Sequence, residues 1–542
     1  MKLEGALARE FDRARGATRG ESACPAPLIN LHFSQLGVVT ACCFNRSFVL
    51  GVYPDRSVAE IWNGSAAQGL RAALAQGDFS KGCGQCWQQL QARDFGGSHA
   101  VFYTRQAGLL AERRRQLELP LASEPLPLKL EFNVHNACNL QCIMCHGLAS
   151  SAIRTRREGL SAQPNPYDAT FAQQLEPYLP QVVETDFIGG EPFLVPVYRT
   201  IWELLRRVNP RARVCILTNG TILDAGLQEL LEHINCEIHV SIDSFRKQTY
   251  ERIRRGASLD QVLAHSRYFQ ELMARRGLPL TWRYCPLRLN WHEIPETLSY
   301  CTEHNILLFF NQVESPIGLA LTTLPPAELA RVIETLQAQE PRLAPSPVAL
   351  ENLQHYRELV SRLQAFLRPE VRADALRSRL DTARAVVSQY SRGREDALRA
   401  RGDGARQDAL TQAIKNLLIA RLNIEQAAAD SGVSSDARAQ LEAAERALLE
   451  LRAEVKYGEF VGTYLKELIR TYSGVFGVVE VHEPAVFAHV DAFAAGLGAA
   501  GPGEGAGDAD WSRVLRPEPG AVYAATALGS SVRRLEQWFA SL

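Results

Sequence analysis

The sequence predicts an α/β fold, namely an incomplete (β/α)6 barrel with a cysteine-rich module before it and a mostly helical region after it. Two observations carry this prediction. Strand-like and helix-like segments alternate between residues 127 and 313, and all twelve cysteines lie within the first 301 of the 542 residues. Such alternation predicts βα units around a parallel sheet. Six units are too few to close an eight-stranded barrel, so we expect an incomplete one.

Six apolar runs are expected as the strands of the barrel. They are residues 128–135, 183–190, 213–220, 237–243, 280–287 and 306–313. Segments with helical periodicity separate them, at residues 168–179, 197–208, 225–234, 259–277 and 294–305. Right-handed crossovers then place the six strands side by side and parallel.

The rest of the chain differs in composition from the barrel. Residues 24–95 combine short β-like pieces with a helix and two groups of cysteines, and a basic linker helix follows. Beyond the barrel the sequence becomes rich in Ala, Arg, Glu and Leu, as in a helical hairpin or short coiled coil. The predicted divisions are 1–23 (extension), 24–95 (cysteine-rich module), 96–125 (linker helix), 126–323 (barrel), 324–475 (helical region) and 476–542 (C-terminal segment with a Gly/Ala-rich linker).

The composition predicts a globular protein of the cytoplasm. Apolar residues make up 46% and charged residues 22%, and the formal net charge is -1. No apolar run is long enough to cross a bilayer, and the charged N-terminus lacks the apolar core of a signal peptide. In this compartment cysteines more often bind metals or react than form disulfides. The balanced charge argues against a nucleic-acid partner.

Three cysteines, Cys138, Cys142 and Cys145, follow the first barrel strand within the stretch NACNLQCIMCHG. In a parallel barrel the loop after a strand lies at the C-terminal mouth, where catalytic groups gather. Three thiolates on a [4Fe–4S] cluster leave one iron open to an outside ligand, as catalytic metal sites require. Two alternatives remain, namely buried core thiols or a zinc site completed by His146.

This cysteine loop resembles the signature of the radical S-adenosylmethionine (SAM) superfamily. The resemblance implies that the amino and carboxylate groups of SAM bind the open iron. It also implies that one-electron cleavage of SAM then yields a 5'-deoxyadenosyl radical. Met144 stands where the family often has an aromatic residue near adenine, and its thioether suits the same contact.

Further matches to the family follow on successive strands. Gly189, Gly190 and Glu191 end the second strand in the turn GGEP, where glycines permit close backbone approach and a carboxylate suits the SAM ammonium. The resemblance implies further SAM contacts at the ends of the third and fourth strands and from one arginine. These are Thr218, Asn219, Ser241, Asp243 and Arg254. The alternatives are strand-ending turns, helix caps and a surface arginine.

A second set of cysteines precedes the barrel. Cys24, one of Cys42 or Cys43, Cys83 and Cys86 supply four thiolates, which suit a closed [4Fe–4S] cluster or a structural zinc ion. The stretch that contains them resembles the twitch module, a shortened form of the SPASM domain that holds one auxiliary [4Fe–4S] cluster. The resemblance implies Cys42 as the ligand and leaves Cys43 as the alternative. In many relatives this module follows the barrel, whereas here it precedes it.

The remaining cysteines are spread over strands and helices, and we interpret them as core thiols: Cys215, Cys236, Cys285 and Cys301. Cys285 has an alternative, because its strand should face the barrel lumen, where a thiol could donate a hydrogen atom or form a thioether. Other lumen candidates are divided between two faces by strand alternation. They are Trp282, Arg283, Tyr284, Asn311 and Gln312.

Together the resemblances imply a radical SAM enzyme that modifies a small metabolite or peptide by oxidation or bond formation, assisted by the auxiliary cluster. Sulfur insertion with that cluster as sulfur donor is the alternative within the class. A non-catalytic electron carrier or redox sensor is the alternative outside it. The implied partners are SAM, the substrate and a reductant such as a flavodoxin or ferredoxin. The C-terminal helices are candidates for a protein partner or self-association.

Overall fold

The computed structural model describes most of the first 368 residues. The gaps within them are 17–20, 46–47, 92, 94, 96, 120–125, 146, 148, 158–161, 164, 314–318 and 325, and residues 439–440, 442–444 and 463 are also described. The predicted helical hairpin and the predicted C-terminal segment therefore lie almost entirely outside the described residues.

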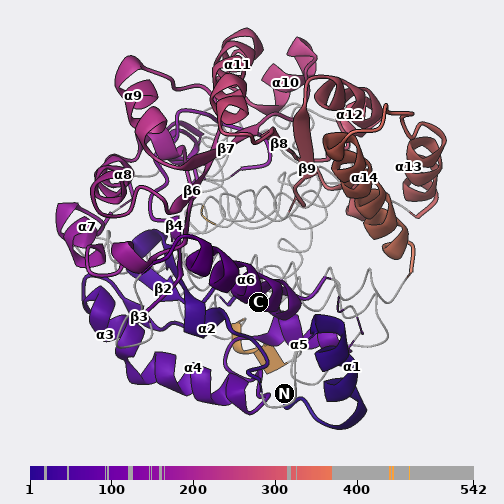
Figure 1. Cartoon of the computed structure of the whole chain (residues 1–542). Helices are drawn as coiled ribbons and strands as arrows, with labels where there is room; N and C mark the ends of the chain where they lie inside the picture. Colours follow the sequence, from indigo (N-terminus) through magenta and orange to yellow (C-terminus); the bar gives the residue numbers. More distant parts are fainter. Residues whose placement is uncertain are drawn as a thin grey trace, which may run out of the picture.

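One largely parallel sheet of nine strands organises the described part of the chain (Figure 1). Its strands are β1 (Asn30–Ser34), β2 (Val38–Thr40), β3 (Gly51–Val52), β4 (Lys129–Asn133), β5 (Glu184–Phe187), β6 (Arg213–Thr218), β7 (Cys236–Ser241), β8 (Leu280–Tyr284) and β9 (Ile306–Phe310). Their order in space is β3-β2-β1-β4-β5-β6-β7-β8-β9. Each of β4 to β9 is parallel to the next, which confirms the six strands predicted from the alternating segments.

Most helices connect these strands and lie along the outside of the curved sheet (Figure 1). Helix α6 (His99–Gln116) instead approaches the inner face of β4, where Tyr103 donates a hydrogen bond to Glu131 Oε1 at 2.9 Å. The helices that precede the barrel strands are α1 (Gly5–Arg15), α2 (Ala26–Ile29), α3 (Val58–Asn63), α4 (Ser65–Ala75), α5 (Gly84–Gln91) and α6. Those that follow are α7 (Ala169–Leu175), α8 (Pro196–Val208), α9 (Ala225–His233), α10 (Lys247–Ile253), α11 (Leu259–Arg275), α12 (Ile294–Glu303), α13 (Pro326–Ala338) and α14 (Pro347–Ala365). Asp168 and Asp224 cap the N-termini of α7 and α9 with their carboxylates. Within the described residues, no helix is both long and apolar enough to cross a membrane.

Strand β1 adds to the edge of the barrel sheet. It runs parallel to β4, with Asn30 opposite Lys129 and Ser34 opposite Asn133. Strands β2 and β3 continue the sheet in antiparallel pairing. The sequence predicted short β-like pieces here but not their pairing with the first barrel strand. Backbone hydrogen bonds therefore hold the N-terminal cysteines in place relative to the barrel strands.

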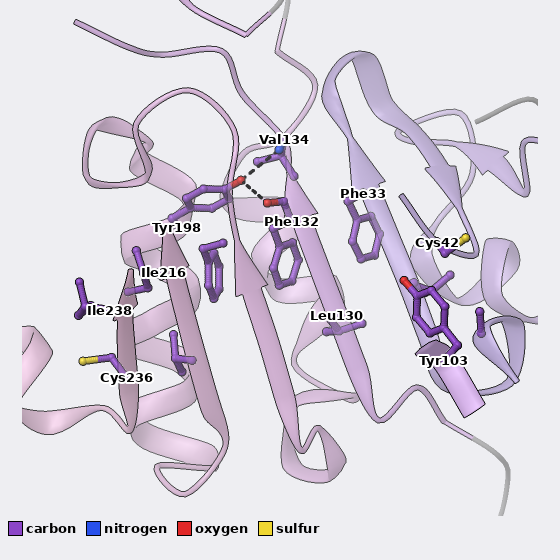
Figure 2. Close-up of a cluster of buried hydrophobic side chains, with 14 of the residues drawn as sticks. Phe33, Cys42, Tyr103, Leu130, Phe132, Val134, Tyr198, Ile216, Cys236 and Ile238 are labelled. Atoms are coloured by element: carbon purple, nitrogen blue, oxygen red, sulfur yellow. Dashed lines mark hydrogen bonds between the residues drawn. The ribbon is translucent and has the colours of Figure 1, made fainter. Parts of the chain in front are cut away.

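Each strand divides its side chains between two faces. Those on the outer face are buried under the helices, and the rings of Phe33, Phe132 and Phe187 stack in a row with centroids 5.4 and 4.9 Å apart. Figure 2 shows this layer, which also contains Leu130 and Ile216. On β6 to β9 the side chains of the inner face alternate with the buried ones and are mostly half-buried. The inner face is therefore the one that a ligand can reach.

Helix α14 covers the outer edge of β9. The fully buried side chain of Asn352 accepts a hydrogen bond from Leu308 N–H at 2.7 Å and donates one to Ile306 O at 3.0 Å. These backbone groups would otherwise be open to a further strand. The start of the predicted helical region thus completes the sheet and is not merely an appendage.

Tyr198 of α8 joins the C-terminal ends of β4 and β5 (Figure 2). Its hydroxyl accepts a hydrogen bond from Val134 N–H at 3.1 Å. The same oxygen lies 2.9 Å from Phe132 O and 2.8 Å from Ile188 O, so that its single proton is shared between these two carbonyls. One buried side chain thus sets the directions in which the chain leaves both strands.

We predict that Tyr198→Phe lowers the free energy of unfolding by about 1–3 kcal/mol, because a buried N–H and buried carbonyls lose their partner. Urea denaturation of the full chain measures this. Tyr268→Phe is the matched control, because the hydroxyl of Tyr268 makes only contacts of 3.4 and 3.5 Å at a less buried position. Equal effects of the two substitutions would contradict the role given to Tyr198.

Candidate functional site

The cysteine loop leaves the C-terminal end of β4 and is tied to a second segment by backbone hydrogen bonds. Gln141 N–H donates to Arg255 O and Ile143 N–H donates to Ile253 O, both at 2.9 Å, so the loop pairs with the chain that ends α10. Cys138 N–H donates to Ser151 Oγ at 3.0 Å. The loop is therefore a folded element of its own.

Cys138, Cys142 and Cys145 are all free thiols. Burial raises the pKa of Cys138, and it raises the pKa of Cys142 to about 11 although Arg254 opposes this. The charge of Cys138 raises the pKa of Cys142 further, so the two thiols are near neighbours. Thiolates crowded in this way are stable when a metal binds them. His146, the alternative zinc ligand, lies outside the described residues.

The turn formed by Gly189 and Gly190 approaches the cysteine loop so closely that only glycine fits. Both residues have positive φ, 85° and 55° respectively. A Cβ on Gly189 would lie 1.9 Å from Asn133 Oδ1, and one on Gly190 would lie 2.3 Å from Ala137 O. Glu191 N–H donates to the same Ala137 carbonyl at 2.6 Å. The two glycines were predicted to allow close backbone approach to a ligand. In the structure they allow the turn to approach the protein's own chain, at the end of β4 and in the loop after it.

The Glu191 carboxylate is fully buried and joins the end of β5 to the end of β6. It accepts hydrogen bonds from Thr218 Oγ1 and Asn219 N, both at 2.7 Å, and from Phe193 N at 3.1 Å. Burial raises its pKa to about 7, although these donors favour the charged form. The side-chain amide of Asn219 in turn lies 3.9 Å from the sulfur of Cys138. Glu191, Thr218 and Asn219 are therefore brought to the cysteine loop together.

Asp243 and Arg254 form a buried ion pair beside the same loop. Arg254 Nε lies 2.7 Å from Asp243 Oδ2, and Asp243 Oδ1 accepts a hydrogen bond from Cys285 N–H at 2.7 Å. Burial alone would lower the pKa of Arg254, but the charges of Asp243 and Cys142 raise it above its ordinary value. Arg254 thus holds a positive charge next to the cysteines and is not an ordinary surface arginine.

Ser241 and Met144 complete the set predicted for SAM. Ser241 ends β7 on the inner face and is half-buried. Met144 packs against an apolar cluster that includes Ile253 and Leu287. Ser151 was not predicted, because a serine thirteen residues after Cys138 belongs to no motif of its own.

A second group of four thiols lines one cavity in the N-terminal part of the chain: Cys24, Cys42, Cys83 and Cys86. The cavity has a volume of about 20 Å³ for the centres of water-sized spheres, and Cys43 is not among its lining residues. Tyr103 of α6 also borders it, close to Cys42 (Figure 2). Asn45, another lining residue, donates from Nδ2 to the sulfur of Cys83 at 3.5 Å. Neither Tyr103 nor Asn45 stood out in the sequence, because each is distant in sequence from the thiol that it approaches.

Burial is the main cause that raises the pKa of these thiols, to about 12 for Cys42, Cys83 and Cys86. The pKa of Cys24 is raised in the same way, and also by the charges of its three neighbours. The four thiols line one cavity, an arrangement that suits a [4Fe–4S] cluster, in which each cysteine binds a different iron.

The two cysteine sets lie at opposite ends of adjacent strands. Cys24 precedes β1 and Cys42 follows β2, which is antiparallel to β1, so both lie toward the N-terminal end of β1. Cys138 follows the C-terminal end of β4, the parallel neighbour of β1. A strand of this length rises by roughly 13–17 Å. The residues of β1 and β4 between the two sets are buried on both faces, and half-buried inner-face residues lie farther along the sheet, on β6 and β7.

Strand alternation settles which of the predicted lumen residues reach the inner face. Arg283 lies on it and is half-buried, whereas Trp282 and Tyr284 lie on the outer face and are buried. Asn311 and Gln312 follow β9, where Asn311 N–H donates to Tyr284 O at 2.8 Å.

One of the four predicted core thiols is not a core residue. Cys236 and Cys301 belong to the hydrophobic core as predicted, and Cys285 packs at the edge of an apolar cluster. Cys215 instead lies half-buried on the inner face, opposite Asp186. The prediction was wrong because the apolar run of β6 does not reveal which alternate residues face inward.

Two family models match the chain where the two cysteine sets lie. Residues 132–301 match the radical SAM superfamily, and residues 24–87 match the SPASM iron–sulfur cluster-binding domain. Residues 132–301 are therefore a radical SAM domain, and residues 24–87 are a SPASM-type iron–sulfur domain that precedes the barrel strands, as predicted. The cofactors of these domains are a [4Fe–4S] cluster with SAM and an auxiliary iron–sulfur cluster.

Curated relatives of the chain include several GTP 3',8-cyclases. That of Chlorobaculum tepidum is 27% identical over 33% of this chain and 52% of its own length. The probable GTP 3',8-cyclase of Methanocella arvoryzae is 32% identical over 25% of this chain and 40% of its own length. The chain thus spans about half the length of the curated relatives that it matches.

Solved structures with some similarity include two proteins that hold SAM. Streptococcus suis SuiB bound to S-adenosylmethionine is 17% identical, with a TM-score of 0.29 over 44% of this chain and 49% of that one. Native anSMEcpe with bound AdoMet is 17% identical, with a TM-score of 0.31 over 39% of this chain and 59% of that one.

We predict that Gly190→Ala displaces the cysteine loop, because the new Cβ meets a backbone carbonyl and the positive φ is strained. The expected loss is at least about 1–2 kcal/mol of unfolding free energy, together with lower iron content of the cysteine loop. Anaerobic iron analysis and urea denaturation measure the two effects.

Gly108→Ala is the control, because it lies within α6 with nothing within 4 Å of its Cβ position. That substitution should keep the iron and raise stability slightly, since alanine favours a helix over glycine. If Gly190→Ala retained full stability and iron, the close contact would have no structural importance.

Proposed function

We propose that this enzyme oxidises a small metabolite or peptide bound on the inner face of the sheet, between its two clusters. The observation that carries the proposal is the placement of the two cysteine sets at opposite ends of β1 and β4, in the same sheet as the half-buried inner-face residues of β6 and β7. We also propose that β4 to β9 form the incomplete (β/α)6 barrel of the superfamily, with domain boundaries near residues 95, 125 and 323.

At the C-terminal end of the sheet, Cys138, Cys142 and Cys145 are the proposed ligands of the SAM cluster. A [4Fe–4S] cluster bound by these cysteines would supply the electron that cleaves SAM, and this cleavage produces a 5'-deoxyadenosyl radical able to abstract hydrogen. The residues of the chain hold SAM for that step. Arg254 offers its charge to the SAM carboxylate, and Asn219 offers hydrogen-bond donors near the cluster.

The other predicted SAM residues divide into contacts and supports. Ser241 offers a hydroxyl to the ribose and Met144 an apolar surface to adenine, whereas the fully buried Glu191 carboxylate, predicted as an acceptor for the ammonium, supports the site from within the protein. The supports keep these contacts in place through the close turn, the Glu191 hydrogen bonds and the Arg254 ion pair. They are Gly189, Gly190, Thr218 and Asp243.

At the other end, the four cavity thiols are the proposed ligands of the auxiliary cluster, with Cys42 preferred to Cys43 because only Cys42 lines the cavity. Four thiolates bind every iron of a [4Fe–4S] cluster and leave none for a substrate. Such a closed cluster suits the acceptance of an electron. We therefore favour net oxidation over sulfur insertion, for which the cluster would have to be dismantled.

The curated relatives support a small metabolite as the substrate, because their names specify GTP. A flavodoxin or ferredoxin is the proposed reductant. A non-catalytic electron carrier is the weaker candidate, because an electron carrier has no use for an iron that only three cysteines bind.

We predict that the full chain, purified without oxygen, contains about eight irons and cleaves SAM to 5'-deoxyadenosine when reduced with dithionite. Cys138→Ala should lower cleavage to the level of iron-free protein, because the SAM cluster loses one of three ligands. Cys301→Ala, a buried core thiol outside both sites, is the control and should retain both iron and cleavage. Loaded clusters without cleavage of SAM would favour the electron carrier.

We predict a different outcome for Cys86→Ala, which removes one ligand of the proposed auxiliary cluster. Iron should fall to about four per chain while SAM cleavage remains, since the two sets are separate. Electron paramagnetic resonance of the reduced protein should lose one of two signals. Unchanged iron, or stoichiometric zinc in place of the lost iron, would refute an auxiliary cluster at these residues.

A further inference from the structure

A belt of ion pairs crosses the inner face from β4 to β7. Lys129 Nζ lies 2.6 Å from both Glu184 Oε1 and Asp186 Oδ2. On the next strand, Arg213 pairs with Glu184 at 2.8 Å and also with Glu237. Each cation of the belt therefore has two carboxylate partners, of which Glu184 is shared. Both cations are thus engaged within the protein.

Arg283 of β8 stands at the end of this belt and lacks such partners. Its Nε donates to His239 Nδ1 at 2.9 Å, and His239 Nε2 lies 3.0 Å from Glu237 Oε1. In the described part of the chain, no carboxylate lies within ion-pair distance of Arg283. The remaining guanidinium N–H groups have no acceptor there either.

On the neighbouring strand, an aromatic ring rather than a carboxylate lies beside Arg283. Phe309 of β9 lies opposite Arg283 in the sheet register, and the guanidinium carbon is 4.2 Å from its ring centroid. The ring and His239 hold the plane of the guanidinium, which is the pre-organised form in which arginine binds oxyanions with two hydrogen bonds.

The electrostatic balance agrees with this geometry. Burial lowers the pKa of Arg283, and the charges of Asp186 and Glu237 offset this only in part. Burial also lowers the pKa of His239, so its ring is neutral and its Nδ1 accepts from Arg283. Both nearby acids are already engaged by Lys129 and Arg213. Arg283 thus lacks a direct carboxylate partner and lies half-buried on the inner face.

We propose that Arg283, stacked on Phe309, binds an oxyanion of the substrate, either a carboxylate or a phosphate. The inference rests on the proposed function, because it specifies the substrate class for the same inner face. Ser241 of β7 lies directly opposite Arg283 in the register. Adjacent strands are about 4.8 Å apart. The anchored end of the substrate therefore lies beside the SAM end of the sheet.

The test uses the full chain with both clusters loaded, in anaerobic equilibrium dialysis with SAM present. Inorganic pyrophosphate and citrate are the probes, because they represent the phosphate and carboxylate sources. Wild-type protein should bind at least one of them. Arg283→Gln should weaken that binding about tenfold to a hundredfold, since a charge-assisted pair is lost. Arg283→Lys should show a smaller loss, because it keeps the charge without the planar fork.

Arg207→Gln is the matched control, because Arg207 pairs with Glu176 on the exposed surface of α8. It should bind the probes as wild type does. Binding of pyrophosphate alone would assign a phosphate-bearing substrate, and binding of citrate alone a carboxylate-bearing one. Equal binding by wild type and Arg283→Gln, or no binding of either probe to wild type, would overturn the inference.

Iron content and SAM cleavage are measured on the same samples, so the two proposals fail separately. Normal SAM cleavage without anion binding would refute the role of Arg283 and leave the proposed function intact. Anion binding that depends on Arg283, without SAM cleavage in any sample, would refute the proposed function alone. Arg283→Gln should retain wild-type iron, which shows that a loss of binding does not arise from misfolding.

Discussion

The parallel pairing of β1 with β4 is the constraint on which the rest of the structure depends. Five consecutive residue pairs, from Asn30–Lys129 to Ser34–Asn133, join segments that are distant in sequence. Because the ends of a strand have a fixed spacing, this pairing places the four-thiol cavity and the cysteine loop at opposite ends of one rigid unit. The added strand occupies the β4 edge of the barrel strands although it precedes all of them in the sequence.

Buried charges maintain the geometry at the C-terminal end of the sheet. Glu191 links β5 to β6 through Thr218 and Asn219, and Asp243 links β7 to the end of α10 through Arg254. A buried carboxylate is costly unless donors or a cation compensate it. A shift of any of these strand ends would leave such a charge uncompensated. The residues that resemble SAM contacts therefore also determine the shape of the site around SAM.

Features that repeat along the sequence were predictable, and features that depend on register or distant contacts were not. Alternating segments predicted the six parallel strands, and the order of the cysteine loop, the GGEP turn and later strand ends predicted which residues gather at one end. The pairing of β1 with β4 is a long-range contact without a local signal. The face of the sheet on which Cys215 lies depends on the strand register, because a shift of one residue moves a side chain to the other face. For the same reason Trp282, Arg283 and Tyr284 could be assigned to faces only from the structure.

The residues of the inner face change along the sheet from paired charges to an arginine beside apolar side chains. This change indicates where on the sheet the substrate would bind. From β4 to β7 each cation is compensated by carboxylates, whereas at β8 the pattern stops and β9 contributes Leu307 and Phe309. A buried arginine without a direct carboxylate partner is costly, so a neutral residue would serve a purely structural role better. A bound oxyanion would supply that partner, and the register with Ser241 would put that ligand beside the SAM end. The belt of paired charges would then lie between the substrate and the auxiliary cavity, where an electron leaving the substrate has to cross.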